Sequence, residues 1–585
     1  MVLLQSTTPL TAIPTNLTVP QFLLDEYHHV TRPTRLARTP CLIDDDTGQV
    51  VFIDELRARS RDIASVMYHR FKIQHDDIVS IMSYNHIDFG PCVWATHRVG
   101  GVVSTLSPTL VLGELVHHLN IAKPSLLIVH ADCLLMAVSA ASSINLALDR
   151  LIIIEAPVWK EPVPYHSLHE LIEQGSHLPP PVERILCEGE GKRAIAFLAP
   201  SSGTTGIQKA VSITHFNVVS MIIQEATFNK LNEAYAPWNE QRFRPGDVCG
   251  GFLPLYHIYG LVFNLHYMLY AAMSLVLSRK FHFESFLATS VRFSRTPTAD
   301  IAFLTRLVPP QAVLLCKHPA VKNYNLSCVR YCIIAAAPLS ASLTEELLTV
   351  MPNVQLGQAY GMTETCGAVS MFPVTQKVGT LGSGGQLLPG TTAKVVKEDG
   401  TIARDGEVGE LFIKGGQVAL GYYGNPTVTA ETFVDGWLRT GDQVMFKGGD
   451  LFVMDRVKEL IKVKGFQVPP AELEGHLLTH TCIADAAVIG VADDFAGELP
   501  LGFIVLKPAV DRAVKEDPAF AEEVRFNIFE HVAKSKSTYK WLTGGIVFID
   551  AIPRNASGKI LRRLLRQQTK KHSRSSVSPQ CHAKM

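Results

Sequence analysis

Residues Ala194–Lys209 read AIAFLAPSSGTTGIQK, an apolar stretch followed by small and hydroxyl-bearing residues that end in a lysine. Backbone N–H groups and Ser or Thr hydroxyls of such a loop can close on phosphate oxygens, while Lys209 adds a positive charge. We therefore predict a phosphate-binding loop after a strand. The order of residues differs from the GxxxxGK(S/T) pattern, which disfavours a P-loop NTPase. The alternative is an ordinary surface turn, because Gly, Ser and Thr often cluster in loops.

Apolar runs on both sides of this loop predict an α/β fold. The runs IVSIM (Ile78–Met82), SLLIV (Ser125–Val129) and LIIIE (Leu151–Glu155) alternate with helical patterns. This alternation is typical of parallel strands joined by crossover helices. Further along, DVCGGFLP (Asp247–Pro254) and RYCIIAAAPL (Arg330–Leu339) are strands that end in small-residue loops. Such loops lie where α/β sheets bind ligands.

The last third of the chain has a different pattern of short strands broken by turn residues. After Gly390, short strands such as TAKVVKEDG and GELFIKGG predict a small β-rich subdomain. A helix that starts at Pro470 and the strands AAVIGVAD and LGFIVLK then predict a small α+β domain. We place the N-terminal domain at residues 1–455, the C-terminal domain at 456–565, and a basic, Ser-rich tail, expected to be disordered, at 566–585.

Composition narrows the class of protein. A chain of 585 residues exceeds what one hydrophobic core organises, so at least two folding units are expected. Its 54 Lys and Arg balance 54 Asp and Glu, and 47% of its residues are hydrophobic, which favours a compact globular protein over a nucleic-acid-coating one. Eleven cysteines without a CxxC pair indicate a reducing intracellular compartment and no disulfide framework.

No membrane segment is expected. The longest stretch without Asp, Glu, Lys or Arg is Val248–Ser278, and it contains Pro254, His257, Asn264 and His266. Each of these would place a polar or helix-breaking group in hydrocarbon, so a buried core segment is the better interpretation. The first residues lack the charged start and sustained apolar run of a secretory signal.

Three further motifs hold polar residues suited to a nucleotide. GQAYGMTET (Gly357–Thr365) offers Tyr360 as an aromatic platform, the hydroxyl of Thr363 and the carboxylate of Glu364, which suits Mg²⁺ beside a phosphate loop. Glu364 alone is also explained as an acid at a helix N-terminus. Asp442 in WLRTGDQV and Arg456 in MDRVKE are suited to ribose hydroxyls. The alternative for these two is a turn aspartate and an exposed arginine.

Near the end of the chain, NASGKILRR presents Lys559 after a small, flexible turn. A cation there can reach into a cleft and neutralise charge on a transferring group. A solvated lysine is the alternative.

Together, these motifs resemble the adenylate-forming acyl-CoA synthetase superfamily of AMP-binding enzymes, nearest to coumarate-CoA ligase-like enzymes. The resemblance covers roughly Phe52–Arg563 and includes SSGTTGIQK, LPLYHIYG, AAAPL, GQAYGMTE, GELFIKG, GYYGNP, GWLRTGD, DRVKELIKVKGFQVPPAELE and NASGKILRR, in the family's order. It implies an ATP-dependent ligase that adenylates an acid and then forms its CoA thioester. A large N-terminal domain would carry a small C-terminal domain that rotates between the two steps about Asp455 and Arg456.

The resemblance also implies a role for each motif residue. It assigns phosphate binding to Ser202, Gly203, Thr204, Thr205, Gly206 and Lys209; phosphate and Mg²⁺ to Thr363 and Glu364; adenine to Ala336, Gln358, Ala359 and Tyr360; ribose to Asp442 and Arg456; the adenylate to Lys458 and Lys462; coenzyme A to Lys464, Gly465 and Lys280; the reacting centre to Gln467; and catalysis to Lys559. Gln208, Ala210, Ala335 and Ala359 depart from the family's usual proline and glycines. None of these departures removes a charged or hydroxyl group.

The acyl pocket of similar ligases is lined from the LPLYHIYG segment. This implies substrate contacts at His257, Tyr259 and Phe263, with Ala336 and Gly361 at the sides. A hydrogen-bonded core histidine is the alternative for His257. No acidic residue in this segment can pair an ammonium group, so an apolar wall favours an aryl or aliphatic acid over an amino acid. Phe263 either shortens the pocket or stacks on an aryl acid.

The chain ends in Ala583, Lys584 and Met585, a tripeptide that resembles the peroxisomal address SKL. We therefore expect a peroxisomal import receptor as a partner, with a plain basic tail on a cytoplasmic protein as the alternative. Three other functions fit the same fold: loading of a carrier protein, silent binding of an acyl group or nucleotide, and luciferase-like oxygenation.

Overall fold

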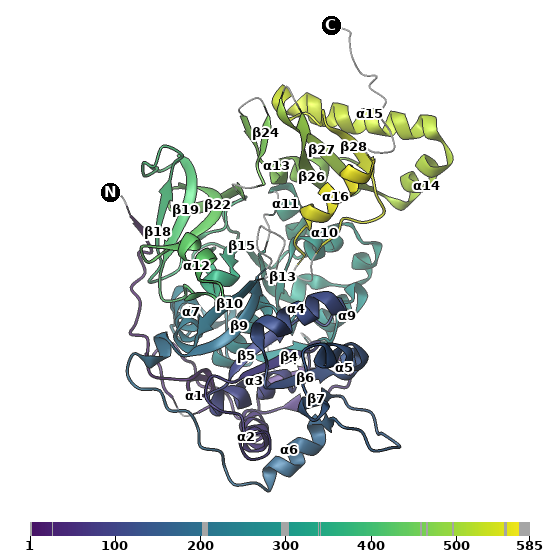
Figure 1. The fold of residues 1–585 in the computed structure, drawn as a ribbon. Coiled ribbons are helices and arrows are strands. Elements are labelled where there is room, and N and C mark those ends of the chain that lie inside the picture. Colours follow the sequence, from purple (N-terminus) through teal and green to yellow (C-terminus); the bar gives the residue numbers. More distant parts are fainter. Residues whose placement is uncertain are drawn as a thin grey trace.

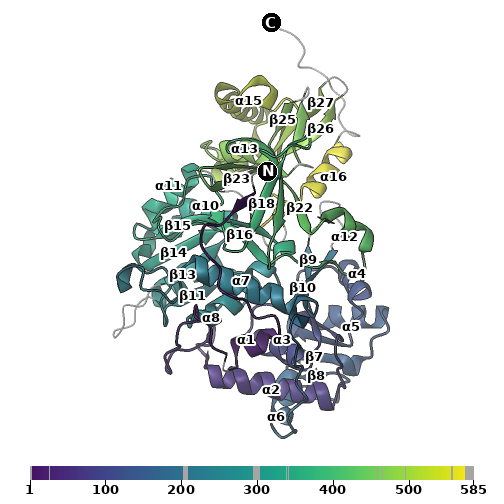
Figure 2. The same ribbon diagram turned by 90° about the vertical axis from the view of Figure 1, so that its left-hand side faces the viewer.

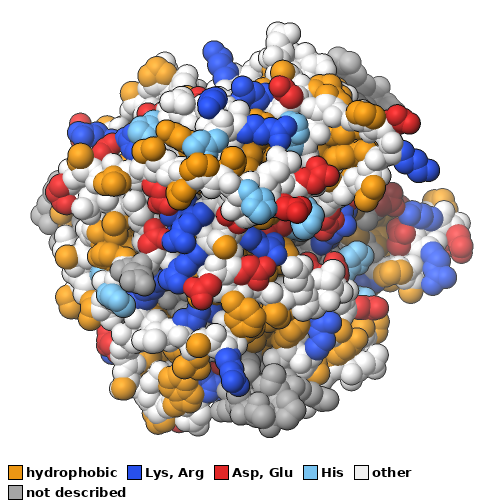
Figure 3. Space-filling view, turned by 90° about the horizontal axis from the view of Figure 1, so that it is seen from below, with side chains coloured by type: hydrophobic (Ala, Val, Ile, Leu, Met, Phe, Trp, Pro, Cys, Tyr) orange, Lys and Arg blue, Asp and Glu red, His pale blue; other side chains and the backbone are white. Residues whose placement is uncertain are grey.

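The computed structural model describes residues 3–25, 27–201, 209–293, 303–336, 339, 341–456, 459–463, 466–493, 496–554 and 558–572. Figure 1 shows two stacked α/β layers at the base, a β-rich layer above them and a smaller unit at the top. Charged side chains of both signs are interspersed with apolar ones on the face seen from below (Figure 3). This mixture agrees with the balanced composition of the chain.

The first sheet has eight strands in the order β20-β10-β9-β5-β4-β6-β7-β8. Their bounds are Gly421–Tyr422, Lys209–Thr214, Ile195–Ser201, Val102–Leu106, Ile78–Met82, Leu126–His130, Leu151–Ile154 and His166–Ser167. From β9 to β8 every neighbour is parallel. This confirms the expected parallel strands, and the crossovers include α3 (Phe89–Arg98), α4 (Leu112–Ala122) and α5 (Leu134–Ser143), while α2 (Ile53–His69) leads into β4 from the second sheet.

The second sheet has nine strands in the order β17-β16-β15-β14-β13-β11-β12-β2-β3. Their bounds are Gln386–Leu387, Gly367–Met371, Gln355–Met362, Val329–Ile334, Phe303–Leu307, Val248–Gly251, Ser274–Leu277, Leu42–Asp44 and Val50–Val51. Neighbours from β15 to β2 are parallel. The helices α9 (Phe283–Arg292), α10 (Pro309–Lys317) and α11 (Ala341–Val350) belong to this half.

The main core lies between the two sheets and surrounds α7 (His215–Phe228). All residues of α7 except Phe216 are buried, including the polar Asn217, Gln224 and Glu225, so this helix lies inside the core. Its start is fixed by a capping box, in which the Thr214 hydroxyl accepts from the Asn217 amide and the Asn217 side chain accepts from the Thr214 amide.

The uncharged stretch Val248–Ser278 forms part of this core. It folds as β11, a π-helix (η5, Tyr259–His266), the short helix α8 (Tyr267–Tyr270) and β12. Within the described residues, no helix has both the length and the apolar character needed to cross a membrane. π-Helical turns are rare and occur often at functional sites.

The third sheet confirms the predicted β-rich subdomain. Its strands are β1 (Leu4–Gln5), β18 (Thr392–Val396), β19 (Val408–Lys414), β21 (Phe433–Val434), β22 (Trp437–Lys447) and β23 (Asp450–Arg456), all with antiparallel neighbours. The N-terminal segment runs along the side of the large domain to reach β18 (Figure 2). The sequence patterns did not indicate this long-range pairing.

A fourth sheet forms the unit at the top of Figure 1 and confirms the predicted α+β fold. It contains β24 (Ile461–Val463), β25 (Phe466–Val468), β26 (Ile483–Asp493), β27 (Gly497–Leu506) and β28 (Gly545–Phe548), with helices α13 (Pro470–Leu477), α14 (Pro508–Glu516) and α15 (Pro518–Ser535). The chain leaves the third sheet at Arg456 and enters the fourth at Ile461. The boundary at residue 455 stays a prediction.

The expectation of a disordered tail from residue 566 is wrong for its first residues. Helix α16 spans Arg562–His572 and continues seven residues past Leu565. The side chain of Leu565 is fully buried against Ile552 and strands β26 and β27, and this packing anchors the helix. Its sequence contains no Gly or Pro that would end it earlier. Residues Ala583, Lys584 and Met585 lie outside the described residues.

Candidate active site

A cavity of about 510 Å³ lies where the large domain meets the C-terminal unit. Its walls come from the end of β5, from η5, from the ends of β14 and β15 and from residues Arg554–Arg566 of the C-terminal unit. Strand ends of both parallel sheets therefore meet at one site, as expected for ligand sites in α/β proteins.

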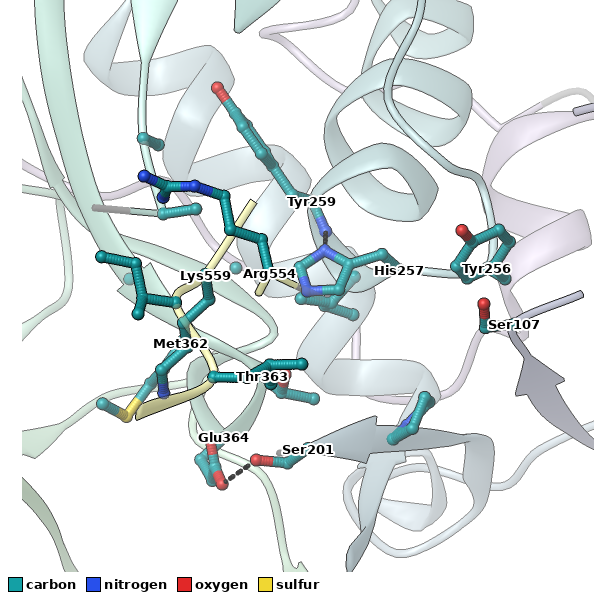
Figure 4. Close-up of a pocket in the computed structure, with 18 of the residues that line it drawn as sticks. Ser107, Ser201, Tyr256, His257, Tyr259, Met362, Thr363, Glu364, Arg554 and Lys559 are labelled. Atoms are coloured by element: carbon teal, nitrogen blue, oxygen red, sulfur yellow. Dashed lines mark hydrogen bonds between the residues drawn. The ribbon is translucent and has the colours of Figure 1, made fainter. Parts of the chain in front are cut away.

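Glu364 is held at one end of this cavity by hydroxyl groups from two other segments. The Ser201 hydroxyl donates to Oε1 of Glu364 at 2.8 Å, and the Tyr422 hydroxyl donates to the same oxygen at 2.9 Å. Figure 4 shows Ser201 and Glu364 joined in this way below Thr363. Because side chains from β9 and β20 hold this carboxylate in place, a ligand-binding role for Glu364 is favoured over that of a simple acid at a helix N-terminus.

Lys209 is brought to the same end of the site. Its Nζ lies 4.7 Å from the centroid of the Tyr422 ring, a cation–π arrangement. Tyr422 thus links the lysine at the end of the glycine-rich loop to the carboxylate of Glu364. The loop residues Ser202, Gly203, Thr204, Thr205 and Gly206 lie outside the described residues.

The residues expected around the nucleoside are linked to one another. The Tyr360 hydroxyl donates to Oδ2 of Asp442 at 2.6 Å, which joins the expected adenine platform to an expected ribose ligand. The register of β22 and β23 places Arg456 directly opposite Asp442. Oε1 of Gln358 accepts from the backbone amide of Leu339 at 2.8 Å and ties the AAAPL loop to β15. In that loop Ala336 adopts a left-handed φ of 77°, which is uncommon outside glycine.

Lys559 reaches the cavity from the C-terminal unit and lines it together with Thr363 and Glu364. Gly558 precedes it with a left-handed φ of 81°, and a Cβ at Gly558 would lie 3.2 Å from a methyl group of Val308. Arg554 donates to the backbone oxygen of Gly558 at 2.9 Å. The Lys559 segment is therefore seated on the start of α10 in the large domain.

The same cavity is also lined by the residues expected to contact the acid: His257, Tyr259, Phe263, Ala336 and Gly361. The Tyr259 and Phe263 rings meet edge to face, with centroids 5.7 Å apart. Gly361 permits a close approach, because a Cβ there would overlap the backbone oxygen of Gly367.

His257 is a neutral hydrogen-bond donor toward the cavity. Its Nδ1 accepts from the Tyr259 backbone amide at 3.3 Å, so the proton of the neutral ring is on Nε2. Burial lowers the pKa of His257 to about 4, which keeps the ring uncharged at neutral pH. Figure 4 shows the ring directed into the pocket, across from Lys559 and Met362.

Arg306 also lines the cavity, and sequence patterns did not single it out. It lies on β13 within FLTRLVPP, where a lone arginine in an apolar run has no motif around it. The side chain is buried and forms an ion pair with Glu225 on α7, with 2.8 Å between Nη2 and Oε1. Its guanidinium lies 5.2 Å from the centroid of the Phe263 ring. The expected apolar wall is therefore interrupted by a cation.

Two family models match the chain: that of the AMP-binding enzymes over residues 31–423, and that of their C-terminal domain over residues 472–559. The chain belongs to the AMP-binding enzymes. Among curated proteins it is 33% identical over 566 residues to 4-coumarate–CoA ligase 2 of Oryza sativa subsp. japonica, an alignment that covers 94% of the chain and 93% of that ligase. It is also 33% identical over 551 residues to an acyl-CoA ligase of Dothideomycetidae sp. (strain 11243), with 90% and 92% covered.

Among solved structures, this AMP-binding enzyme has the fold of the anthranilate CoA ligase AuaEII in complex with anthranoyl-AMP, with a TM-score of 0.78 at 21% identity and coverage of 96% of the chain and 99% of that structure. At this identity the likeness shows the fold alone. The family models and the sequence relatives confirm a coumarate-CoA ligase-like member of the superfamily.

Several predicted residues of the AMP-binding enzyme lie away from the cavity. Lys280 is 3.9 Å from Asp132 and 4.2 Å from the Tyr84 ring centroid, and it does not line the cavity. Lys462 is exposed on β24, opposite Gln467 on β25. Lys458, Lys464, Gly465 and the side chains of Arg456 and Gln467 lie outside the described residues.

A divalent ion fits the AMP-binding enzyme only as a partner of bound phosphates. Within the described ranges no three His, Cys, Asp or Glu side chains gather to hold a metal ion. Glu364 offers one carboxylate at the phosphate end, with Oε1 already accepting two hydrogen bonds. This suits Mg²⁺, which keeps several waters and combines one or two carboxylates with substrate phosphates.

Proposed function

We propose that this enzyme joins a carboxylic acid to coenzyme A in two steps at one cavity. The acid's carboxylate first attacks the α-phosphate of ATP, which forms an acyl-adenylate and releases pyrophosphate. The thiol of coenzyme A then attacks the acyl carbon, which forms the thioester and releases AMP. The supporting observation is that Lys559, Thr363 and Glu364 line the same cavity as His257.

In the first step the chain supplies charge and position. Lys559 places a cation where negative charge grows on the transferred phosphate, and Lys209 stands at the end of the phosphate loop. Tyr360 and Asp442 orient the nucleoside from one side. A Mg²⁺ ion held by the phosphates and Glu364 would add further positive charge against the leaving pyrophosphate.

At the acyl end, His257 donates from Nε2 to the acid's carboxylate without adding a charge of its own. A neutral donor binds the carboxylate while leaving it nucleophilic, whereas an imidazolium would hold its charge too firmly. The C-terminal unit forms one wall of the cavity, which favours transfer of the adenylyl group to the acid over hydrolysis of ATP by water.

For the second step we propose that the C-terminal unit rotates about Asp455 and Arg456. Rotation withdraws Lys559 and brings the face that carries Lys462, Lys464, Gly465 and Gln467 to the cavity, where Lys280 also contacts coenzyme A. This explains why Lys462 does not line the cavity in the present arrangement. Domain closure of this kind gates many enzymes.

Pyrophosphate release tests the first step. We would measure it with ATP and Mg²⁺ across aryl and aliphatic acids, with and without coenzyme A, and analyse the thioester product. Lys559→Ala should lower release by roughly two to three orders of magnitude, in line with loss of one group that stabilises the transition state. Lys317→Ala, an exposed lysine paired with Glu346 outside the cavity, is the matched control.

Release of pyrophosphate that needs no acid, or full activity in Lys559→Ala, would contradict the proposal. Adenylation without any thioester would instead favour transfer to a carrier protein. Binding of ATP without turnover of any acid would favour a silent binding protein.

We also propose that the tripeptide Ala583-Lys584-Met585 directs the enzyme to peroxisomes through the import receptor. Its support is the resemblance of this tripeptide to SKL. A fluorescent fusion at the N-terminus should colocalise with a peroxisomal marker and become diffuse when the three residues are deleted. Diffuse fluorescence of the full chain would contradict the proposal.

A further inference from the structure

The acyl end of the cavity contains a buried charge pair that the two-step reaction does not use. Arg306 on β13 lines the cavity, and its only hydrogen bond among the described residues goes to Oε1 of Glu225 on α7. Both side chains are almost completely buried. The guanidinium stands 5.2 Å from the Phe263 ring and 5.6 Å from the Tyr267 ring, so it lies beside the aromatic part of the cavity wall.

This pair is left with unmatched hydrogen-bonding groups. Within the part of the chain that the structure describes, Nε of Arg306, Oε2 of Glu225 and the Tyr267 hydroxyl are buried without a hydrogen-bond partner. Buried polar groups in folded proteins are nearly always bonded, and each exception calls for an explanation. Of these groups only Arg306 lines the cavity, so a ligand bound there can supply a partner for its guanidinium.

Arg242 shows what a purely structural arginine looks like in the same core. It is equally buried, yet its guanidinium donates to the side chains of Gln355 and Asn229 and to the backbone oxygens of Phe372 and Pro373. Arg242 does not line the cavity. The arginine that faces the cavity is therefore the one that lacks partners.

We propose that Arg306, held in place by Glu225, is a specificity-determining residue that binds an oxygen atom at the end of the acyl group remote from the reacting carboxyl. Arginine only donates hydrogen bonds, so the group it binds must accept. A neutral acceptor, a hydroxyl or carbonyl oxygen, matches the site best, because Glu225 already balances the charge of Arg306 from behind the cavity wall. The substrate class is thus acids with a terminal hydroxyl or carbonyl oxygen, in preference to plain hydrocarbon acids.

A second carboxylate fits less well than a hydroxyl, since it would lie beside the carboxyl of Glu225. Burial raises the pKa of Glu225 to about 7, which limits this repulsion only when the group is protonated. An ammonium group is disfavoured, because it would face the guanidinium of Arg306. The preferred order at neutral pH is therefore hydroxyl or carbonyl first, carboxylate second and amine last.

The inference rests on the proposed ligase reaction, and the test separates the two. We would measure kcat and KM for thioester formation with hexanoate and with its terminally hydroxylated, carbonyl-bearing, carboxylated and aminated forms, and with phenylpropanoate and its ring-hydroxylated form. In the unaltered enzyme, kcat/KM should be about 10-fold to 100-fold higher for the hydroxylated acid of each pair, as expected for one hydrogen bond to a charged group.

The double variant Arg306→Met with Glu225→Leu removes both buried charges together, which folded proteins usually tolerate when the volume is kept. Its preference for the hydroxylated acid over the plain acid should fall to about 1, chiefly through a higher KM for the hydroxylated acid. Arg306→Lys, which keeps the charge, should retain part of the preference. A thermal unfolding curve shows whether each variant is folded.

Equal use of plain and hydroxylated acids by the unaltered enzyme would overturn the inference and leave the ligase reaction standing. A preference that persists in the folded double variant would overturn it as well. Failure of every acid to release pyrophosphate would count against the proposed function itself.

Discussion

At the scale of single residues, the site depends on side chains that hold other side chains. Glu364 is positioned by Ser201 and Tyr422, and Asp442 by Tyr360. Hydrogen bonds to a charged group contribute about 1.5–3 kcal/mol, more than those between neutral partners. The hydroxyl groups of Ser201 and Tyr422 therefore fix the position of the Glu364 carboxylate before the nucleotide binds.

Removal of the Tyr422 hydroxyl tests this arrangement. Tyr422→Phe keeps the ring under Lys209 but leaves Oε1 of Glu364 with one donor instead of two. We expect the rate of pyrophosphate release to fall by roughly 10-fold and the Mg²⁺ concentration for half-maximal rate to rise, because the carboxylate is less well oriented. Tyr423→Phe, at the exposed neighbouring residue, should behave as the unaltered enzyme. Equal Mg²⁺ dependence in the two variants would refute the role of Tyr422.

His257 gives a second prediction at this scale, on pH dependence. Because burial lowers its pKa to about 4, the ring is neutral throughout the range from about pH 6 to pH 8. His257→Ala should lower kcat/KM by roughly 10-fold through loss of one donor, by the same factor at every pH in this range. We would compare pH profiles of kcat/KM for the two enzymes. A ratio that changes with an inflection near the ordinary histidine pKa would show that the ring titrates during catalysis.

At the scale of elements, the site is built where strands end and the backbone takes unusual conformations. The π-helix that carries Tyr259 and Phe263 and the left-handed Ala336 border the cavity, and the left-handed Gly558 directly precedes the cavity-lining Lys559. Gly558 matters most for the reaction, since it decides how Lys559 enters. Its backbone is accessible to an L-residue only with strain.

Substitution of Gly558 should uncouple the two half-reactions. Gly558→Ala introduces strain of about 1–2 kcal/mol and a close contact with Val308, which belongs to the large domain. Adenylation should therefore slow by roughly 10-fold or more, whereas synthetic acyl-adenylate and coenzyme A should still form thioester at the normal rate. Gly448→Ala is a matched control, because Gly448 has a left-handed φ of 60° in open space. Equal slowing of both half-reactions would show that the conformation of Gly558 is not specific to the adenylation step.

The sequence predicted those elements whose pattern is local. The runs IVSIM and LIIIE correspond to strands β4 and β7. The motif loops lie at strand ends, because a buried apolar strand ends where the sequence changes to polar and small residues. The pairing of β1 with β18 was not predictable, since it joins segments almost 400 residues apart by two backbone pairs. Helix α16 was missed because the burial of Leu565 is a tertiary contact.

The candidate site likewise contains residues that the sequence predicted and a residue that it did not. Residues in recurring motifs, such as Thr363, Glu364 and Lys559, line one cavity as the resemblance implied. Arg306 was not predictable, because nothing in FLTRLVPP distinguishes a cavity-lining arginine from a core arginine such as Arg242. Only the neighbouring elements, α7 with Glu225 and η5 with Phe263, give it a possible function.

At the scale of the whole molecule, the large domain holds four neutral histidines, of which His97, His215 and His266 are buried in the core and His257 lines the cavity. Burial lowers the pKa of His215 to about 3, lowers those of His257 and His266 to about 4, and places that of His97 well below its ordinary value. His266 accepts from the Trp94 indole and His215 from the Val19 amide, bonds that require an unprotonated nitrogen. Folding therefore excludes protons that the unfolded chain would bind.

The large domain should consequently lose stability as the pH falls below about 6.5. A lowered pKa in the folded state means that the histidine contribution is fully present above the unfolded value near 6.5 and is lost as the pH falls toward 4. Glu225 acts in the opposite direction, since burial raises its pKa to about 7 and the folded state binds its proton first. Each histidine held neutral adds about 1.4 kcal/mol per pH unit to the slope near pH 5, and the four histidines outweigh the single carboxyl of Glu225.

Denaturant unfolding of the large domain at a series of pH values measures this slope. His266→Gln keeps an acceptor for Trp94 but cannot be protonated, so the slope should fall by about one proton, or roughly 1.4 kcal/mol per pH unit. His169→Gln, at an exposed histidine on α6 (Leu168–Ser176), should leave it unchanged. Equal stability of the unaltered enzyme at pH 5 and pH 7 would show that buried neutral histidines do not govern its acid sensitivity. The π-helix would then have to keep its packing against Trp94 with His266 protonated.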